Sequence, residues 1–416
     1  MSFLNTDVIE HNVAFNKKCS ASQLIHKLKM NEMKIAELNI PSVDVFQHLL
    51  GTDAYAVQNI HFTNAFNEAK FNHIWGKLKS VFPVLSSVLI YNEKEIKYHF
   101  TNPYNIYTYS NSIEDVICSD ITDLSLEEQL SFKERLSAYL VSKNETTSKY
   151  GARMVVLING EESFELMFRY HCSLFDPINI RDFCKLIRSL YTGWMGELDA
   201  VRKSYGHYIK QYCGHIHSLD LDTIISDYEL KLFVLNSKHL PKQDLGNDLC
   251  EISETLLVED MGECERINYA NNIFRRFYTN YFETKYIVFN LIHDGRGFSV
   301  NDVDYSIGYY FDFIPIYVND DNDFLKNIEH KKNMAFKQNI RFQVLAEHNS
   351  THPVFSRMNR CSVNMFYSKD PEPNFKFWPK KGQLNALFYY SDNQLVIRIE
   401  CPKHGMNRAQ NVLKNL

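Results

Sequence analysis

Apolar residues in the first half of the chain recur at the spacings that strands and helices require. Alternating or β-branched apolar runs predict strands at residues 56–63, 84–91, 153–158 and 164–170. Helical spacing predicts helices at residues 23–38, 43–50, 67–81, 124–142 and 180–193. Asn159-Gly160, a dipeptide typical of hairpins, separates two of the strands, and residues 96–100 are a candidate partner for the strand at 84–91. The strand, turn and helix within residues 163–191 form the most clearly defined unit.

The second half of the chain mixes the same two patterns. Helices are predicted at residues 220–235, 266–282, 323–347 and 407–416, and strands at 285–292, 362–367, 386–390 and 395–400. An apolar stretch at 307–318 is interrupted by Pro315. Residues 240–248 contain Pro241 and Gly246 and are typical of a loop, so we place a domain boundary after residue 240. The chain then has an N-terminal accessory helix (1–38) and two lobes of mixed α/β or α+β class (39–240 and 241–416).

Composition narrows the class of protein. The 416 residues are too many for one core, and 45% hydrophobic with 23% charged residues is an ordinary globular balance. A net charge of −5 without a long basic run argues against a nucleic-acid partner. The nine cysteines are scattered, which favours reduced thiols in a cytoplasmic protein, and neither a signal peptide nor a membrane-spanning run is recognised. We expect a cytoplasmic protein with no membrane partner and no metal or cofactor of its own.

The turn at residues 171–177 carries the candidate chemistry. It places His171, Cys172 and Asp176 between the strand at 164–170 and the helix at 180–193. A base at the end of a strand, with a carboxylate a few residues later that holds the turn, suits acyl transfer. The same residues would also serve a purely structural hydrogen bond, so composition alone leaves both interpretations open.

The residues of this turn resemble the core motif of condensation domains of nonribosomal peptide synthetases. That motif has two histidines, three further residues, an aspartate and a glycine. Without a gap, His171 falls on the first histidine, Cys172 on the second, Asp176 on the aspartate and Pro177 on the glycine. The pair Leu190-Tyr191 at the end of the following helix also matches the family.

Four further stretches agree with the family in order and direction. They are residues 40–47, 82–87, 294–296 and 307–317. The resemblance therefore covers residues 39–416 and implies two chloramphenicol-acetyltransferase-like lobes arranged in a V, with the turn on the tunnel between them. It also implies acyl or peptidyl carrier proteins as partners, each bearing a phosphopantetheine arm that delivers the acyl group. Neither an adenylation signature nor a carrier domain is recognised, so we expect those carriers to act in trans.

The departures from the family pattern fall on its functional positions. Cys172 replaces the histidine that the family uses in catalysis, and Ser86 replaces an arginine that pairs with the motif aspartate. Asp312 and Tyr317 stand where the family has asparagine and arginine, and Pro177 replaces the glycine. Arg296 is interpreted as a turn or salt-bridge residue. Asp312 is an acid inside an apolar stretch, which is costly to bury unless it is paired, so we expect it to line the tunnel.

Cys172 leaves three hypotheses open. A thiol titrates near pH 8.5 against about 6.5 for imidazole, so Cys172 is a poor base at neutral pH. The protein could still join a carrier-bound acyl group to an amine or hydroxyl, because positioning alone can supply about 7–11 kcal/mol. Cys172 could instead be a nucleophile that takes the acyl group as a thioester. Alternatively, the site is catalytically degenerate and the fold is a platform that binds carriers or recruits a tailoring enzyme.

Overall fold

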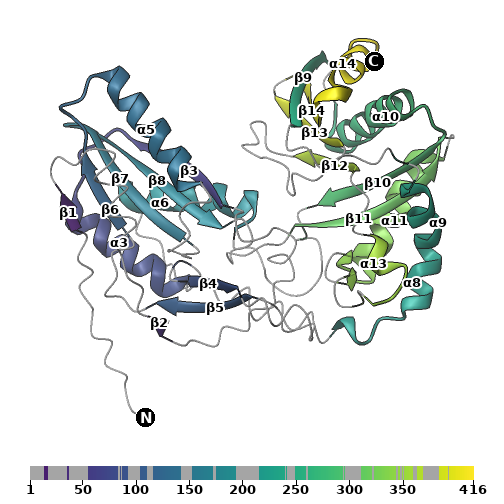
Figure 1. Ribbon diagram of the computed structural model, residues 1–416, viewed down its shortest axis with the longest axis horizontal. Coiled ribbons are helices and arrows are strands. Elements are labelled where there is room, and N and C mark those ends of the chain that lie inside the picture. Colours follow the sequence, from purple (N-terminus) through teal and green to yellow (C-terminus); the bar gives the residue numbers. More distant parts are fainter. Residues whose placement is uncertain are drawn as a thin grey trace. The chain divides into compact units, whose positions relative to one another are not determined.

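The computed structural model describes most of the predicted core. The described residues are 14–16, 35–36, 55–82, 85, 87–91, 104–109, 116–141, 152–171, 175–193, 215–238, 240, 249–258, 261–293, 295, 311–320, 323–342, 345–346, 349, 351–358, 363–368, 384–391 and 393–416. They fall into two compact units (Figure 1). The first comprises residues 1–210 and 302–309, and the second comprises residues 211–301 and 310–416. The mixed α/β class expected from the sequence is confirmed in both.

The first unit is built on a five-stranded sheet. Its strands, in spatial order, are β1 (Ala14–Asn16), β6 (Val116–Asp120), β7 (Ala152–Gly160), β8 (Ser163–His171) and β3 (Tyr55–Phe62). The β7–β8 hairpin confirms the predicted pair of strands. Gly160 is paired with Ser163, so the turn consists of Glu161 and Glu162, and Asn159-Gly160 lies at an irregularity within β7. A separate three-stranded sheet contains β2 (Ile35–Ala36), β5 (Tyr104–Tyr109) and β4 (Ser87–Tyr91).

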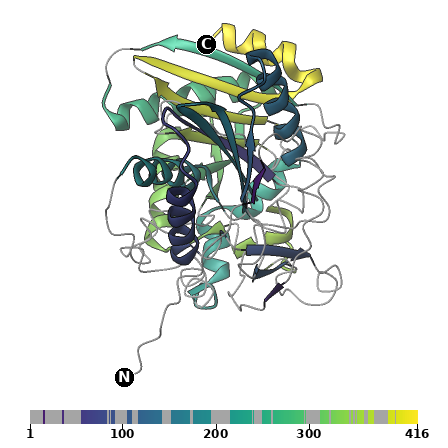
Figure 2. The same ribbon diagram turned by 90° about the vertical axis from the view of Figure 1, so that its left-hand side faces the viewer.

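Helices cover both faces of the five-stranded sheet. On one face, α3 (Glu68–Val81) and α6 (Pro177–Thr192) lie side by side (Figure 2). Their apolar residues, Trp75 and Phe183 among them, share a core with Leu166 and Phe168 of β8. On the other face, α5 (Leu126–Leu140) packs Phe132 and other apolar residues against the sheet. Because successive residues of a strand face opposite sides, β8 contributes to both cores.

One prediction for the N-terminal part is wrong, and another is not tested. Ile35–Ala36 is a strand paired with β5, although the helical spacing had placed it in a helix at 23–38. Pairing with a distant strand outweighs the weak intrinsic preference of so short a segment. Residues 96–100, the candidate partner of the strand at 84–91, lie outside the described residues, and among the described strands β4 pairs with β5. β1 pairs in parallel with β6, so residues 1–38 contribute strands to the first unit in addition to any accessory role.

The second unit is built on a six-stranded sheet. In spatial order its strands are β11 (Asp312–Asn319), β10 (Tyr286–His293), β12 (Val363–Ser368), β13 (Leu384–Ser391), β14 (Gln394–Pro402) and β9 (Leu249–Leu257). β11 runs through Pro315, which the sequence suggested would break the stretch. Proline lacks an N–H to donate and is therefore tolerated on an edge strand, which is where β11 lies.

Helices surround this second sheet. They are α8 (Leu221–Asp227), α9 (Leu230–Ser237), α10 (Glu263–Phe282), α11 (Phe324–Lys337), α13 (Phe355–Met358) and α14 (Met406–Lys414), with a short 3₁₀ turn at Lys403–Gly405. α8 and α9 belong to this unit, so the division lies before residue 215, whereas the loop at 240–248 had suggested a boundary after 240. The reason is packing: α9 contacts β10 and β11, and Lys331 of α11 donates to the carbonyl of Tyr228 between α8 and α9.

A row of asparagines crosses the middle of the second sheet. Asn290, Asn364 and Asn385 are buried and stand directly opposite one another on β10, β12 and β13. Asn290 Nδ2 donates to Asn364 Oδ1 at 3.1 Å, and Asn364 Nδ2 donates to Asn385 Oδ1 at 2.8 Å. Asn385 in turn donates to Glu400 Oε2 at 3.1 Å. This chain of side-chain bonds fixes the register of four strands, because a slip of one residue would break each bond.

Candidate functional site

The motif turn begins at the end of β8 and leads directly into α6. His171 is the last residue of β8 and is paired in register with Tyr55 of β3. Cys172 lies outside the described residues, which resume at Phe175. Phe175 and Asp176 are both buried, at 1% and 0% exposure. The two ends of the turn are therefore fixed, one by the sheet and one by the core.

Asp176 is the N-cap of α6. Its Oδ1 accepts the backbone N–H of Asn179 at 2.8 Å, and its Oδ2 accepts from the side-chain amide of the same residue at 3.1 Å. Pro177 follows at the first helical position, where its missing N–H costs no intrahelical hydrogen bond. The carboxylate thus fixes the start of α6 immediately after the turn, as expected for a residue that holds the turn in shape.

Phe175 anchors the same end of the turn in an aromatic cluster. Its ring lies 5.4 Å from that of Phe168, 5.5 Å from that of Tyr170 and 6.0 Å from that of Phe183. Phe168 and Tyr170 come from β8, and Phe183 comes from the apolar face of α6. Strand and helix are consequently joined by ring contacts on both sides of the turn.

Two buried arginines lie on the other face of the sheet near the end of β8. Arg153 and Arg169 are each 1% exposed and stand opposite one another on β7 and β8. Arg169 Nε donates to the carbonyl of Leu140 at the end of α5 at 2.7 Å, and its guanidinium lies 3.6 Å from the ring centre of Tyr55. Tyr55 is the register partner of His171. Neither arginine was predicted as a site residue, although a charged residue within an apolar strand run is a signal in the sequence that could have indicated both.

The end of α6 is tied back to the start of α3. Tyr191 donates its hydroxyl hydrogen to the carbonyl of Ala65 at 3.1 Å and accepts the N–H of Asn67 at 2.7 Å. Asn67 is the N-cap of α3. Tyr191, the tyrosine of the Leu190-Tyr191 match, therefore has a structural role. It joins α3 and α6, the two helices that cover the same face of the five-stranded sheet.

In the second unit, Asp312 lies in a buried ion pair. Its Oδ2 is 3.4 Å from Arg341 Nε, and both side chains are fully buried. Asp312 stands opposite His293, whose Nδ1 accepts the N–H of Gly295 at 3.0 Å. Burial, with the charges of Arg341 and Lys332, lowers the pKa of His293 to about 3, so this imidazole is neutral near pH 7. Asp312 is thus a buried, paired acid, and its predicted place on the tunnel stays a prediction.

The six candidate residues fall into three groups. Asp176 and Asp312 are buried and bonded as described above. His171 is placed by its backbone at the end of β8. Cys172, Ser86 and Arg296 lie outside the described residues, as does Gln47 of the first matched stretch. Gly295, next to Arg296, has a left-handed φ of 67°.

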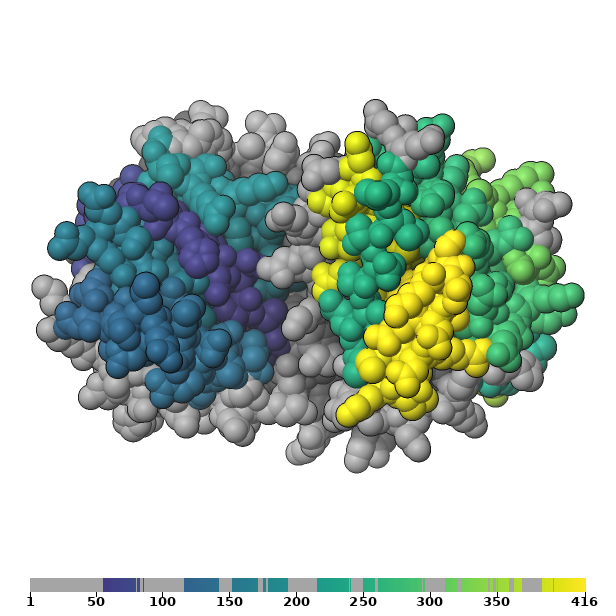
Figure 3. All heavy atoms as spheres, turned by 90° about the horizontal axis from the view of Figure 1, so that it is seen from above, coloured from purple at the N-terminus to yellow at the C-terminus, as the bar shows by residue number. Residues whose placement is uncertain are grey.

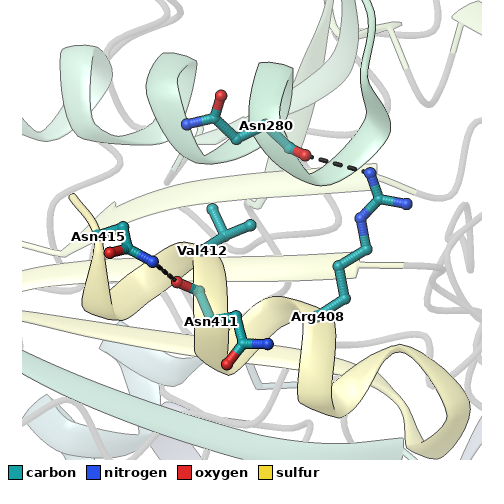
Figure 4. A pocket seen from close by; sticks show the side chains of 5 residues that line it. All are labelled: Asn280, Arg408, Asn411, Val412 and Asn415. Carbon is teal, nitrogen blue, oxygen red and sulfur yellow. Dashed lines mark hydrogen bonds between the residues drawn. The ribbon is translucent and has the colours of Figure 1, made fainter.

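A pocket of about 500 Å³ lies between α10 and α14 (Figure 4). It is lined by Asn280, Arg408, Asn411, Val412 and Asn415. The guanidinium of Arg408 is bonded to the carbonyl of Asn280 at 3.2 Å and to Glu283 at 2.6 Å. None of the candidate residues lines this pocket, and its polar groups lie at the surface. Within the described residues, no group of histidine, cysteine, aspartate and glutamate side chains is arranged to hold a metal.

We compared the chain with protein families, curated proteins and solved structures. No family model and no curated protein matches the chain. Among solved structures, a mutant of the starter condensation domain of rhizomide synthetase matches with a TM-score of 0.63 and 9% identity, covering 92% of this chain and 94% of that one. The epimerization domain of the third module of tyrocidine synthetase B matches with a TM-score of 0.57 and 12% identity, covering 92% and 96%. A four-domain nonribosomal peptide synthetase matches 94% of this chain over 34% of its own, with a TM-score of 0.61 and 14% identity. The chain has the fold of a condensation domain.

The motif turn connects a strand and a helix of the first unit. β8 ends at His171, α6 begins after Asp176, and the residues between them connect a central strand of the sheet to a helix that covers it. Such a turn can present side chains at the edge of the sheet while both of its ends stay rigid. Among the described helices, none is long and apolar enough to cross a membrane.

Proposed function

We propose that the protein is an acyltransferase of nonribosomal peptide or mixed polyketide biosynthesis. In this proposal it joins an acyl or peptidyl thioester, carried on the phosphopantetheine arm of a carrier protein, to an amine or hydroxyl acceptor. The condensation-domain fold over nearly the whole chain is the observation that carries the proposal. The rigid ends of the turn at His171 and Asp176, where the family resemblance puts its motif, give further support.

The proposed reaction replaces one bond at the acyl carbon. The acceptor nitrogen attacks the thioester carbonyl, a C–N bond forms and the C–S bond breaks. The phosphopantetheine sulfur leaves, and the proton lost by the amine ends on that sulfur. The reaction needs no redox partner. Correct placement of donor and acceptor can supply most of the acceleration, about 7–11 kcal/mol.

The side chains around the motif would act by positioning. Asp176 fixes the start of α6, and Phe175 fixes the end of the turn in the aromatic cluster with Phe168 and Tyr170. The Asp176 carboxylate does not need to change its protonation state for this role. Precise placement of this kind matters because small displacements of a catalytic group reduce the rate strongly.

Cys172 would contribute in one of two ways. As a base it would be weak at neutral pH, because only the thiolate can accept the amine proton and a thiol with an unperturbed pKa near 8.5 is mostly protonated. As a nucleophile it would attack the carrier thioester, release the carrier thiol and hold the acyl group as a new thioester. The acceptor amine would then displace the Cys172 sulfur. Each route ends with the same amide, and only the second forms an acylated protein.

A non-catalytic role is the second candidate function. Cys172 stands at the position of the family's catalytic histidine, and Asp312 is engaged in a buried pair with Arg341. These departures favour a platform that binds carrier proteins and recruits a tailoring enzyme. Such a platform would bind carriers without turnover.

Intact-mass spectrometry with acyl-loaded carrier proteins tests these alternatives. With donor carrier and a free or carrier-bound amine, the acyltransferase proposal predicts loss of the acyl mass from the carrier and formation of an amide. Cys172→Ala is expected to reduce the rate by at most about 10²–10⁴-fold if Cys172 is a base, since that is the contribution of an efficient general base. If Cys172 is the nucleophile, the acylated protein disappears in the same variant.

Cys264 provides the matched control. It is an exposed cysteine of α10, and Cys264→Ala is expected to retain the activity of the parent protein. Turnover equal to wild type in both Cys172→Ala and His171→Ala would exclude the motif turn as the active site. Carrier binding without any acyl transfer would support the platform, and absence of both would reject both proposals.

A further inference from the structure

The first and last strands of the second unit bring two cysteines together. β9 is the first strand of this unit in sequence, β14 is the last, and the two are antiparallel neighbours. In their register Cys250 stands directly opposite Cys401. Both are free thiols. The nine cysteines are scattered along the sequence, and 150 residues separate these two, so their spacing alone does not indicate the pairing.

The backbone geometry of this pair suits a disulfide. Directly opposed residues of antiparallel strands have Cα atoms about 4.5–5.5 Å apart. A disulfide requires Cα atoms about 4.4–6.8 Å apart. Opposed residues also project from the same face of the sheet, so the two sulfur atoms are on the same side. We propose that Cys250 and Cys401 form a reversible disulfide that joins the edge strand β9 to β14.

The neighbouring residues hold this register firmly. Arg398 of β14 makes two contacts with Glu251 of β9, from Nε to Oε1 at 3.1 Å and from Nη2 to Oε2 at 2.8 Å. Ile252 and Ile399, the next pair on the face of the cysteines, are both buried. A shift of one residue would separate the cysteines and break both sets of contacts. The pair is therefore held in place before any bond forms.

The two thiols differ in exposure, and this difference indicates which of them reacts first. Cys250 is partly exposed, whereas Cys401 is fully buried. Burial, together with the nearby charge of an ionised Cys250, raises the pKa of Cys401 to about 11. The thiolate is the form that attacks a disulfide, so the accessible Cys250 reacts first with a low-molecular-weight disulfide such as oxidised glutathione.

The disulfide forms from the two thiols in two thiol–disulfide exchange steps. The Cys250 thiolate attacks one sulfur of oxidised glutathione, forms a mixed disulfide and releases one reduced glutathione. Cys401 then attacks the Cys250 sulfur, forms the Cys250–Cys401 bond and releases the second reduced glutathione. Both protein thiols lose their protons, and the two electrons pass to glutathione. Dithiothreitol reverses the reaction.

The bond would constrain a large part of the second unit. It closes a loop from residue 250 to residue 401 that contains β10–β13 with α10 and α11. A disulfide stabilises mainly by limiting the unfolded chain, and the effect grows with the length of the loop. It would also secure the edge strand β9, against which α14 packs; α14 is the yellow ridge beside α10 in Figure 3.

The test is oxidation of the folded protein with oxidised glutathione, followed by peptide mapping without reduction. We expect one linked pair of peptides, containing Cys250 and Cys401, and the loss of two of the nine titratable thiols. The thermal midpoint of the second unit is expected to rise by roughly 5–10 °C and to return on reduction. Acyl transfer is assayed separately, so failure of this proposal leaves the proposed function untouched.

Single substitutions give distinct products. Cys401→Ala is expected to stop at the mixed disulfide, seen as one added glutathione on Cys250. Cys250→Ser is expected to form neither product at this pair, and Cys264→Ser still to form the linked pair. The proposal is overturned if folded wild-type protein retains both thiols, or keeps glutathione on Cys250 without forming the link. It is also overturned if the linkage joins other cysteines.

Discussion

Asp176 illustrates how one residue can serve the motif without reacting. Its carboxylate is fully buried and bonds both the backbone and the side chain of Asn179. Asp176→Ala removes the N-cap of α6, and a lost cap costs about 0.5–2 kcal/mol in unfolding free energy. We expect Asp176→Asn, which keeps an oxygen at the cap, to recover most of this loss. Chemical denaturation of the two variants measures the difference.

Asp182 is the control for Asp176. It lies on the same helix, is 56% exposed and pairs with Arg181. Exposed pairs of this kind contribute little, so Asp182→Ala should change the unfolding free energy by less than about 0.5 kcal/mol. Equal losses in Asp182→Ala and Asp176→Ala would contradict the capping role.

His293 makes stability depend on pH in a defined direction. Its pKa is about 3 in the folded chain, below the ordinary 6.5, because burial and nearby cations disfavour the imidazolium. Between these two values the unfolded chain binds a proton that the folded chain does not. The stabilisation is therefore complete above pH 6.5 and is lost as pH falls towards 3. Between pH 7 and pH 5 the full pKa difference would lower the unfolding free energy by about 2 kcal/mol. We expect at most this loss, because His293 is partly exposed.

His293→Asn isolates this contribution. Asparagine can accept the Gly295 N–H but does not titrate, so the variant should lose less stability than wild type between pH 7 and pH 5. Denaturation curves at both pH values give the comparison. His73, an exposed residue of α3, supplies the control, because His73→Asn should keep the wild-type dependence. An unchanged slope in His293→Asn would contradict the assignment.

At the scale of elements, helices and strands with a clear apolar periodicity were predicted at nearly the observed positions. α3, α6, α10 and the hairpin of β7 and β8 are found where the spacing placed them, to within three residues at their ends. Cap signals explain the agreement: Asn67 begins α3, Asp176 begins α6, and Gly193 ends α6 with a φ of 113°. Helix caps depend only on neighbouring residues, so the sequence alone indicates where these helices begin and end.

Elements that depend on distant partners were missed or extended too far. β6 and β9 were not predicted, although both pair over their full length with neighbouring strands. The helices predicted at 220–235 and 323–347 are interrupted by Glu229 and Asn339, whose φ angles are 51° and 53°. Left-handed backbone at residues other than glycine is uncommon and has no simple sequence signal.

At the candidate site, too, local features were predicted and contacts between distant residues were not. The sequence located the motif turn and the role of Asp176 as the residue that holds it. It gave no indication that Arg341, far along the chain, pairs with Asp312, or that Arg153 and Arg169 stand opposite one another. Such pairs follow from strand register, which a single sequence does not determine. The chemistry of Cys172 stays a prediction.

The whole molecule consists of two units, each with its own sheet. In the first unit α3, α5 and α6 enclose the five-stranded sheet, and in the second the asparagine row joins four strands of the six-stranded sheet. Chains of this size with separate cores often unfold in more than one step. We therefore expect the two units to open independently, each with its own free energy.

Native-state hydrogen exchange of two variants tests this independence. Asp176→Ala weakens α6 of the first unit, and Asn364→Ala removes two bonds from the asparagine row of the second. The lost cap in Asp176→Ala costs about 0.5–2 kcal/mol, and the lost buried bonds in Asn364→Ala cost about 1–3 kcal/mol. These losses correspond to roughly 2–30-fold and roughly 5–150-fold faster exchange, respectively, where opening limits protection. Asp176→Ala should accelerate exchange in β7, β8 and α3 and leave β12–β14 unchanged, whereas Asn364→Ala should do the reverse. Acceleration of both units by either variant would mean that the chain unfolds as one cooperative body. The resemblance to two separate acyltransferase-like lobes would then describe shape without independent stability.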